Sequence, residues 1–175
     1  MRFFIAQGIG FIGLALVFIA FQHNDRRKIL WIQAAGSAVF GLHFFLLGAF
    51  TGMGMNLMEI PRNLTFAREP KRKWLFTSIF IALFVVLGVF TWESPRSLFP
   101  MIAMCLSTVV FSLQKPRSIR FFTVPVSVLW MAYNVFSFSI AGVLTEAFCL
   151  LSIVIAIFRY DILRKNKIKK ENDHE

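Results

Sequence analysis

The sequence is poor in charged residues, and acidic ones are the scarcest. Only 16% of its 175 residues are charged and nine are Asp or Glu, whereas about a quarter of an ordinary soluble domain is charged. The two cysteines, Cys105 and Cys149, both lie in apolar stretches, which excludes a disulfide framework or a zinc cluster. The sequence has no Gly-rich phosphate loop, metal-spaced His/Cys set or nucleophile–base pair. We therefore expect a non-enzyme without cofactor or metal.

Apolar and aromatic residues are abundant instead. They include 22 Phe, and apolar residues make up 57% of the chain. A membrane-spanning helix needs about 20 largely apolar residues, and about 17 to 25 is the usual range. The sequence therefore predicts an all-α membrane protein with seven transmembrane helices, in the following segments: Phe3–Gln22, Ile29–Phe50, Gly52–Ala67, Trp74–Trp92, Leu98–Leu113, Phe121–Phe138 and Ala141–Phe158.

The cations fall on one side of this arrangement. Nineteen Lys and Arg against nine acids give a net charge of +10, and sixteen of these cations lie in alternate connections, at Arg159 and in the tail, residues 161–175. The positive-inside rule then predicts an N-terminus outside and a basic tail in the cytoplasm, where it rests on anionic lipid. No stacking motif or soluble fold accompanies the cations, so the expected partner is the lipid bilayer and not nucleic acid.

The hydropathy pattern repeats after 90 residues. This shift places spans one to three on spans five to seven, a basic connection on a basic connection, and Gly52 on Gly142. Two triplets in the same orientation need one extra crossing between them, as in some transporters. We predict two parallel three-helix repeats, residues 1–70 and 95–160, joined by a linker helix within residues 71–94.

Three stretches carry a resemblance to a known family. AQGIGFIG near the start, GLHFFLLGAF in span two and AGVLTEAF in span seven resemble the YgjV family of bacterial inner-membrane proteins, which implies the bacterial inner (plasma) membrane but no particular activity. The 3+1+3 layout also resembles the SWEET and PQ-loop superfamily of sugar, amino-acid and vitamin transporters. The chain departs from that pattern at Gln22 and Gln114, because neither glutamine follows the usual proline; this puts the superfamily's hinge in doubt.

Span three carries polar residues that are costly in hydrocarbon. Asn56, Glu59 and Asn63 are spaced to share one helix face, and Arg62 is close enough to pair with Glu59. Ionisable groups within a membrane usually face a bundle interior or a watery cavity. The Glu59–Arg62 pair is expected to form a cytoplasmic-side gate or support, or else a local pair whose arginine snorkels. Pro61 either kinks the helix toward the cavity or bends it for packing.

Span seven carries a second polar stripe, which the 90-residue shift predicts to face span three. In SWEET-like transporters an Asn in each of these spans faces the sugar; Asn56 matches the first, but Glu146 replaces the second, which favours a polar or cationic ligand or a proton. Burial disfavours an ionised Glu146, so this residue either carries a proton or packs the bundle in protonated or Arg-paired form. The shift makes three pairs: Asn56 with Glu146, Glu59 with Cys149, and Arg62 with Ser152.

Spans two and six form a further set of polar and aromatic residues. His43 falls on Tyr133, and Trp130 and Asn134 lie beside them. Read as a site, these four line the upper wall of a pocket and offer ring faces to a sugar, base or cation. Read as structure, His43 is a satisfied bundle histidine and Trp130 a packing residue.

The function expected from these patterns is SWEET-like transport of a small polar metabolite by alternating access, with Asn56 and Glu146 contacting the ligand and a proton as a coupling ion. One rival is a non-transporting membrane receptor or assembly partner on the same scaffold. Another is a half-complete unit that forms a homo-oligomer, in which the charges within the membrane satisfy each other at an interface.

Overall fold

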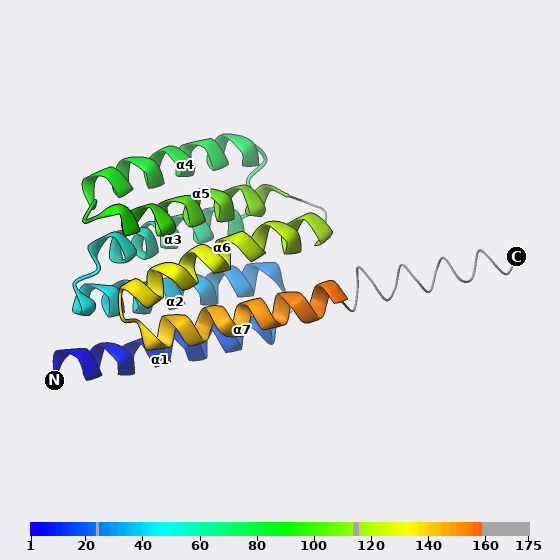
Figure 1. Cartoon of the computed structure of the whole chain (residues 1–175). Helices are drawn as coiled ribbons and strands as arrows, with labels where there is room; N and C mark the ends of the chain where they lie inside the picture. The colour runs from blue at the N-terminus through cyan, green and yellow to red at the C-terminus, as the bar shows by residue number, and fades with distance from the viewer. Residues whose placement is uncertain (24, 114–115, 159–175) are drawn as a thin grey trace, which may run out of the picture.

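The structure is a computed structural model, which describes residues 1–23, 25–113 and 116–158 (Figure 1). Within these residues it has seven α-helices, one short 3-10 helix and no strand, so the fold is all-helical as expected. The predicted tail lies outside the described residues. The helices are α1 (Arg2–Phe21), α2 (Arg26–Leu47), α3 (Phe50–Ala67), α4 (Lys73–Phe90), η1 (Pro95–Ser97), α5 (Leu98–Ser112), α6 (Pro116–Phe136) and α7 (Ile140–Ala156).

Local chemistry explains where the helices depart from the expected spans. The α2 helix begins three residues before the expected Ile29, because the Asp25 side chain caps it by accepting the N–H of Arg27 at 2.9 Å. It ends before Gly48, whose φ of 74° is left-handed. The α6 helix begins five residues before the expected apolar span at Phe121, because a helix need not end where its apolar residues end.

Consecutive helices pack side by side. We call α1, α2 and α3 the first triplet and α5, α6 and α7 the second triplet; α4 packs against α3 and α5 (Figure 1). The triplets meet where α1 contacts α7 and α3 contacts α5. We call the end that holds the N-terminus and the α2–α3 and α6–α7 turns the turn end. The opposite end, with the α1–α2, α3–α4 and α5–α6 connections, is the basic end.

The bundle is apolar on its outside and polar at several places inside. Phe90 and Phe4 are 84% and 77% exposed, whereas Arg62 is 1% exposed and Asn63 is fully buried. A soluble protein shows the reverse distribution, because water would cover its surface.

Among the residues that the structure describes, four helices are long and apolar enough to cross a membrane: Arg2–Ala20, Arg26–Leu47, Lys73–Phe90 and Pro95–Ser112. Two shorter segments, Phe121–Phe136 and Ile140–Ala156, are apolar as well. The 18-residue α3 is not among them, since it contains the polar stripe. Seven crossings therefore stay a prediction.

The α2–α3 and α6–α7 turns have the same local geometry. One residue in each is left-handed: Gly48 has φ 74° and Phe138, 90 positions later, has φ 54°. In each turn the N–H of the last residue donates to the carbonyl five residues earlier, over 2.9 Å in both cases: Ala49 to Phe44, and Ser139 to Asn134.

Candidate functional site

One polar face of α3 is directed at the second triplet. Gly52, Asn56, Glu59 and Asn63 follow one another at intervals of four, three and four residues, so they lie along one side of the helix. At the turn end of this face, the Gly52 N–H donates to the hydroxyl of Tyr133 on α6 at 2.8 Å. Asn56 is buried, and its amide nitrogen donates to the Gly52 carbonyl of its own helix at 2.9 Å.

Arg62 links this face to α5. Its Nη2 donates to Glu59 Oε1 at 2.6 Å, so the ion pair expected between these residues is present. Its Nη1 donates to Ser107 Oγ at 2.6 Å and to Thr108 Oγ1 at 3.3 Å. Asn63 Oδ1 accepts from Nε at 3.3 Å and from Nη2 at 3.1 Å. A guanidinium has five N–H donors, and each of the five has an acceptor.

Two aromatic rings complete the surroundings of Arg62. Its guanidinium carbon lies 4.6 Å from the ring centroid of Phe111 on α5 and 5.7 Å from that of Phe84 on α4. Cations within about 6 Å of a ring centroid are stabilised by the ring. Arg62 therefore ties α3, α4 and α5 together, and it has no free donor for a ligand.

A second carboxylate faces Glu59 from the other triplet. Glu146 on α7 is partly buried and hydrogen-bonds to Ser127 on α6. Glu59 on α3 is close enough to interact electrostatically with it. Within the described residues no cation pairs with Glu146. Cys149 and Ser152, both partly buried, follow at intervals of three residues on the same helix.

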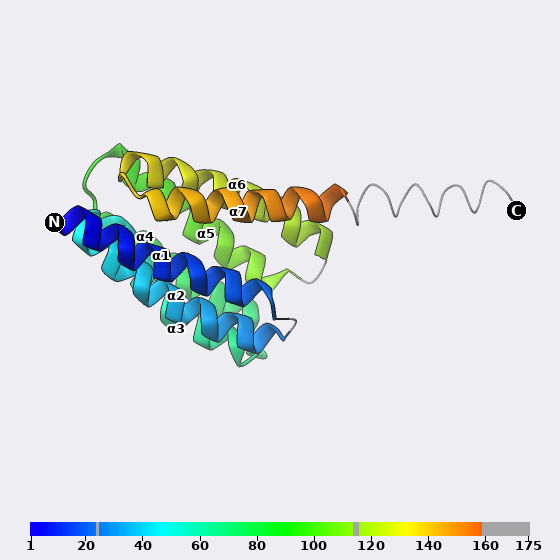
Figure 2. The same ribbon diagram turned by 90° about the horizontal axis from the view of Figure 1, so that it is seen from below.

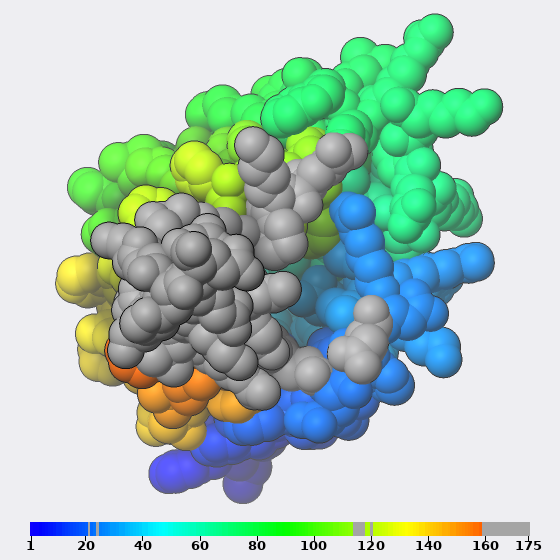
Figure 3. All heavy atoms as spheres, turned by 90° about the vertical axis from the view of Figure 1, so that its right-hand side faces the viewer, coloured from blue at the N-terminus to red at the C-terminus, as the bar shows by residue number. Residues whose placement is uncertain are grey.

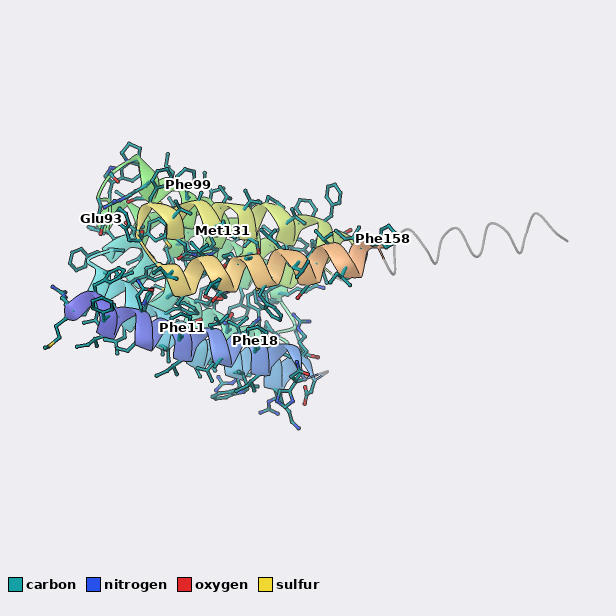
Figure 4. All side chains as sticks on the ribbon, turned by 60° about the horizontal axis from the view of Figure 1, so that its bottom comes forward. Phe11, Phe18, Glu93, Phe99, Met131 and Phe158 are labelled. Carbon is teal, nitrogen blue, oxygen red and sulfur yellow. The ribbon has the colours of Figure 1, made fainter. Side chains whose placement is uncertain are left out.

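The space between the triplets opens toward the basic end. The ribbons converge at the turn end and diverge toward the basic end (Figure 2), and a space-filling view of the basic end shows a hollow between blue and green residues (Figure 3). One side is closed where Phe18 lies between α1 and α7 (Figure 4), with its ring centroid 3.9 Å from that of Phe148. The two carboxylates are partly buried on α3 and α7, one on each side of the interface between the triplets.

At the turn end, His43 joins three segments and is fully buried. Its Nδ1 lies 2.7 Å from the carbonyl of Ala6 on α1, and its Nε2 lies 2.7 Å from Oγ of Ser139. A carbonyl only accepts, so Nδ1 carries the proton and the neutral Nε2 accepts from the serine hydroxyl. Ser139 in turn caps α7 by accepting the Gly142 N–H at 3.0 Å.

The other residues expected in an upper pocket wall lie nearby. Tyr133 and Asn134 are buried in the turn end, and Asn134 Oδ1 has no hydrogen-bond partner. Trp130 is partly buried and stacks on Phe44 with ring centroids 6.0 Å apart. The structure thus places His43 and Tyr133 within a packed end and bonded to protein groups. Pro61 is exposed, and α3 continues through it.

Sequence reasoning missed several polar partners. Gln7 lies among glycines in the sequence, a pattern typical of close helix packing. In the structure it donates to the carbonyl of Phe138 at 2.8 Å and accepts the N–H of Ala141 at 3.3 Å. The glycines do include close packing, since a Cβ on Gly10 would lie 2.8 Å from His43 Nδ1. The hydroxyl partners were not singled out because isolated Ser and Thr are common in apolar helices: Ser97, Ser107, Thr108 and Ser127.

A helical bundle with an apolar surface and a buried ionic network is an integral membrane protein. The chain belongs to the Imp-YgjV family, described as bacterial inner membrane protein, whose profile matches residues 4–164. It is similar to "Inner membrane protein YgjV" of Escherichia coli (strain K12), with 28% identity over 166 residues that cover 95% of this chain and 90% of the relative. No solved structure matches. The protein is therefore an integral protein of the bacterial inner membrane.

Proposed function

We propose that this protein is a carrier of a small polar metabolite that works by alternating access between its two triplets. The observation that carries the proposal is the difference between the two ends: buried hydrogen bonds join the triplets at the turn end, whereas a hollow is seen at the basic end (Figure 3). Each triplet contributes one carboxylate to the interface between them, Glu59 from α3 and Glu146 from α7. Ionisable groups in such a position commonly mark substrate or proton pathways.

The charges of the gap favour a neutral polar or cationic ligand. The charge of Arg62 is balanced by Glu59 at 2.6 Å, and its five donors are already bonded. Glu146 has Ser127 as its neighbour and, among the described residues, no cation. An anionic ligand would meet two carboxylates and no available donor of Arg62. A cation, or a proton on Glu146, would be favoured there.

The repeated geometry supports rocking of two similar units. The α2–α3 and α6–α7 turns, 90 residues apart, have the same hydrogen bond and a left-handed residue at the same place. Both triplets pack their helices in chain order, and α4 lies between them in sequence. By the positive-inside rule the basic end faces the cytoplasm, which makes this an inward-open arrangement.

Flux through purified protein tests the proposal. Proteoliposomes would be offered radiolabelled glucose, alanine, lysine and putrescine, with a trapped dye to follow internal pH. We expect uptake of at least one neutral or cationic probe, and we expect the Glu146→Gln variant to lose most of it. Glu69→Gln is the matched control, because Glu69 is exposed in the α3–α4 connection.

Two results would oppose the carrier. Equal uptake by the Glu146→Gln variant and the unaltered protein would remove this carboxylate from the mechanism. Saturable binding of a probe without any flux would favour the receptor alternative over a transporter.

A further inference from the structure

The turn end contains a set of bonds that the carrier proposal does not use. We propose, on the basis of the proposed carrier function, that these bonds form a gate with approximate twofold symmetry. In this gate the first and second helices of each triplet hold the start of the third helix of the other triplet. The four gate residues form two pairs separated by 90 positions: His43 with Tyr133, and Gln7 with Ser97.

The first pair comes from the middle helices. His43 of α2 accepts a hydrogen bond from Ser139, the N-cap of α7, at 2.7 Å. Tyr133 of α6 accepts one from the N–H of Gly52, in the first turn of α3, at 2.8 Å. Both side chains are fully buried. Each triplet thus presents one polar ring to the third helix of its counterpart.

The second pair comes from the start of α1 and the residue that precedes α5. Gln7 accepts the N–H of Ala141 in the first turn of α7 at 3.3 Å. Ser97 Oγ lies 2.9 Å from Oγ1 of Thr51 in the first turn of α3. Ala141 is 90 positions after Thr51, so the residues contacted are related by the same shift as the residues that contact them. The residues contacted by the first pair, Ser139 and Gly52, are 87 positions apart, so they correspond by their place at the start of α7 and α3.

The proton positions around Ser97 are determined as well. Thr51 Oγ1 donates to the Thr91 carbonyl at 2.5 Å, so its oxygen is left to accept from the Ser97 hydroxyl. Ser97 Oγ accepts the N–H of Glu93 at 3.2 Å. This chain of bonds runs from the α4–α5 connection to α3.

Two glycines allow the gate to close. A Cβ on Gly52 would lie 2.6 Å from Cε1 of Tyr133, and one on Gly10 would lie 2.8 Å from Nδ1 of His43. Real Cβ atoms do not approach other atoms so closely. Both polar rings therefore sit against bare backbone, and a side chain at either glycine would hold the gate apart.

One helix on each side joins a gate contact to a carboxylate: α3 joins Gly52 to Glu59, and α7 joins Ser139 to Glu146. Glu59 follows Gly52 by seven residues on α3, and Glu146 follows Ser139 by seven residues on α7. Seven residues are two helical turns, about 10.5 Å, so each carboxylate lies on the same side of its helix as the gate contact above it. A ligand that draws α3 and α7 together or apart at the carboxylates thereby shifts both gate contacts.

The gate bonds are neutral and modest in strength. Interhelical hydrogen bonds in membrane proteins change an equilibrium by about three-fold on average and about eighteen-fold at most. Their partners are the otherwise unpaired amides of two helix N-termini and two hydroxyls, which water can take over when the end opens. The gate is thus strong enough to favour closure and weak enough to open.

Thiol access from each side tests the gate in the full-length protein. Cys149, three residues after Glu146 on α7, would be the sole thiol in a Cys105→Ala background. A charged, membrane-impermeant methanethiosulfonate would be applied to right-side-out and inside-out vesicles. We expect Tyr133→Phe and Gln7→Leu each to raise the labelling rate from the turn end about three-fold or more. The double variant should show the product of the two effects, and labelling from the basic end should fall.

Thr123→Val is the matched control on α6, because among the described residues the Thr123 hydroxyl bonds only to the Ile119 carbonyl of its own helix, at 2.7 Å. An unchanged turn-end rate in the folded double variant, or an equal rise in the control, would overturn the gate. Shifted access without flux of any probe would uphold the gate and remove the carrier. A Cys149 that is labelled from neither side in any variant would overturn both, since no wet gap would then exist.

Discussion

The two ends of the gap are held together by different chemistry. At the turn end, neutral side chains of α1, α2 and α6 bond to the start of α7 and α3. At the basic end, charge and aromatic rings around Arg62 join α3 to α4 and α5. Among the described residues there, no hydrogen bond joins α1 or α2 to α6 or α7, although Arg26 of α2 donates to the Phe111 carbonyl of α5 at 3.1 Å.

The neutral hydrogen bonds of the turn end are easier to break than the ion pair of the basic end. Neutral bonds near the membrane surface can be exchanged for bonds to water at low cost. A buried ion pair that loses a partner leaves an uncompensated charge, which is costly. We therefore expect α3 and α5 to stay joined around Arg62 at the basic end, which serves as the pivot, while the two triplets change their separation at the turn end.

The largest effect is expected when Arg62 is replaced. Arg62→Leu leaves Glu59 without its counter-ion and removes the link to α5, and breaking a buried pair in this way costs about 3–5 kcal/mol. The measurement is thermal unfolding of the purified protein in detergent. Arg68→Leu, at the exposed C-cap of α3, should change the midpoint little. An Arg62→Leu midpoint equal to that of Arg68→Leu would show that the network does not stabilise the fold.

An intermediate effect is expected for alanine at the two gate glycines. Gly52→Ala and Gly10→Ala force Tyr133 or His43 to move, and such overpacking costs about 1–3 kcal/mol. Gly8→Ala is the control, because a Cβ there meets nothing within 4 Å and alanine favours a helix over glycine. The same unfolding assay, together with thiol access at Cys149, measures the result. Three alanine variants with equal stability and equal access would contradict the close seating of the two rings.

The smallest effect is expected at the α6–α7 turn. Phe138 is left-handed with φ 54°, a conformation that costs a non-glycine residue roughly 1–2 kcal/mol. Part of this gain is offset by the greater freedom of glycine in the unfolded chain, so Phe138→Gly should raise stability by about 1 kcal/mol or less. Phe136→Gly, in the last helical position of α6, should lower it. A loss of stability in both variants would show that the ring of Phe138 matters more than its backbone.

The sequence predicted the helices better than it predicted their partners. Hydropathy placed all seven helical segments, since long apolar runs are a local property. The Glu59–Arg62 ion pair could also be predicted from the sequence, because its members lie three positions apart on one helix. Gln7 and Phe138 are 131 positions apart, and no local pattern specifies such a contact. The 90-residue spacing of His43 and Tyr133 was visible in the sequence, but only the structure shows that each ring contacts the start of the third helix of the other triplet.

The self-contained ion pair of α3 has a consequence for how the protein is made. An arginine opposes the insertion of a helix by at most about 2.5–3.5 kcal/mol on the biological scale, the value at the helix centre, and α3 is not among the helices apolar enough to cross alone. Glu59 is synthesised three residues before Arg62, so the charge can be neutralised before α5 exists to supply Ser107 and Thr108. We expect α3 to pause at the translocon until α4 has been made. The α4 helix is more apolar than α5, and its insertion would bring α3, with the Glu59–Arg62 pair, into the bilayer.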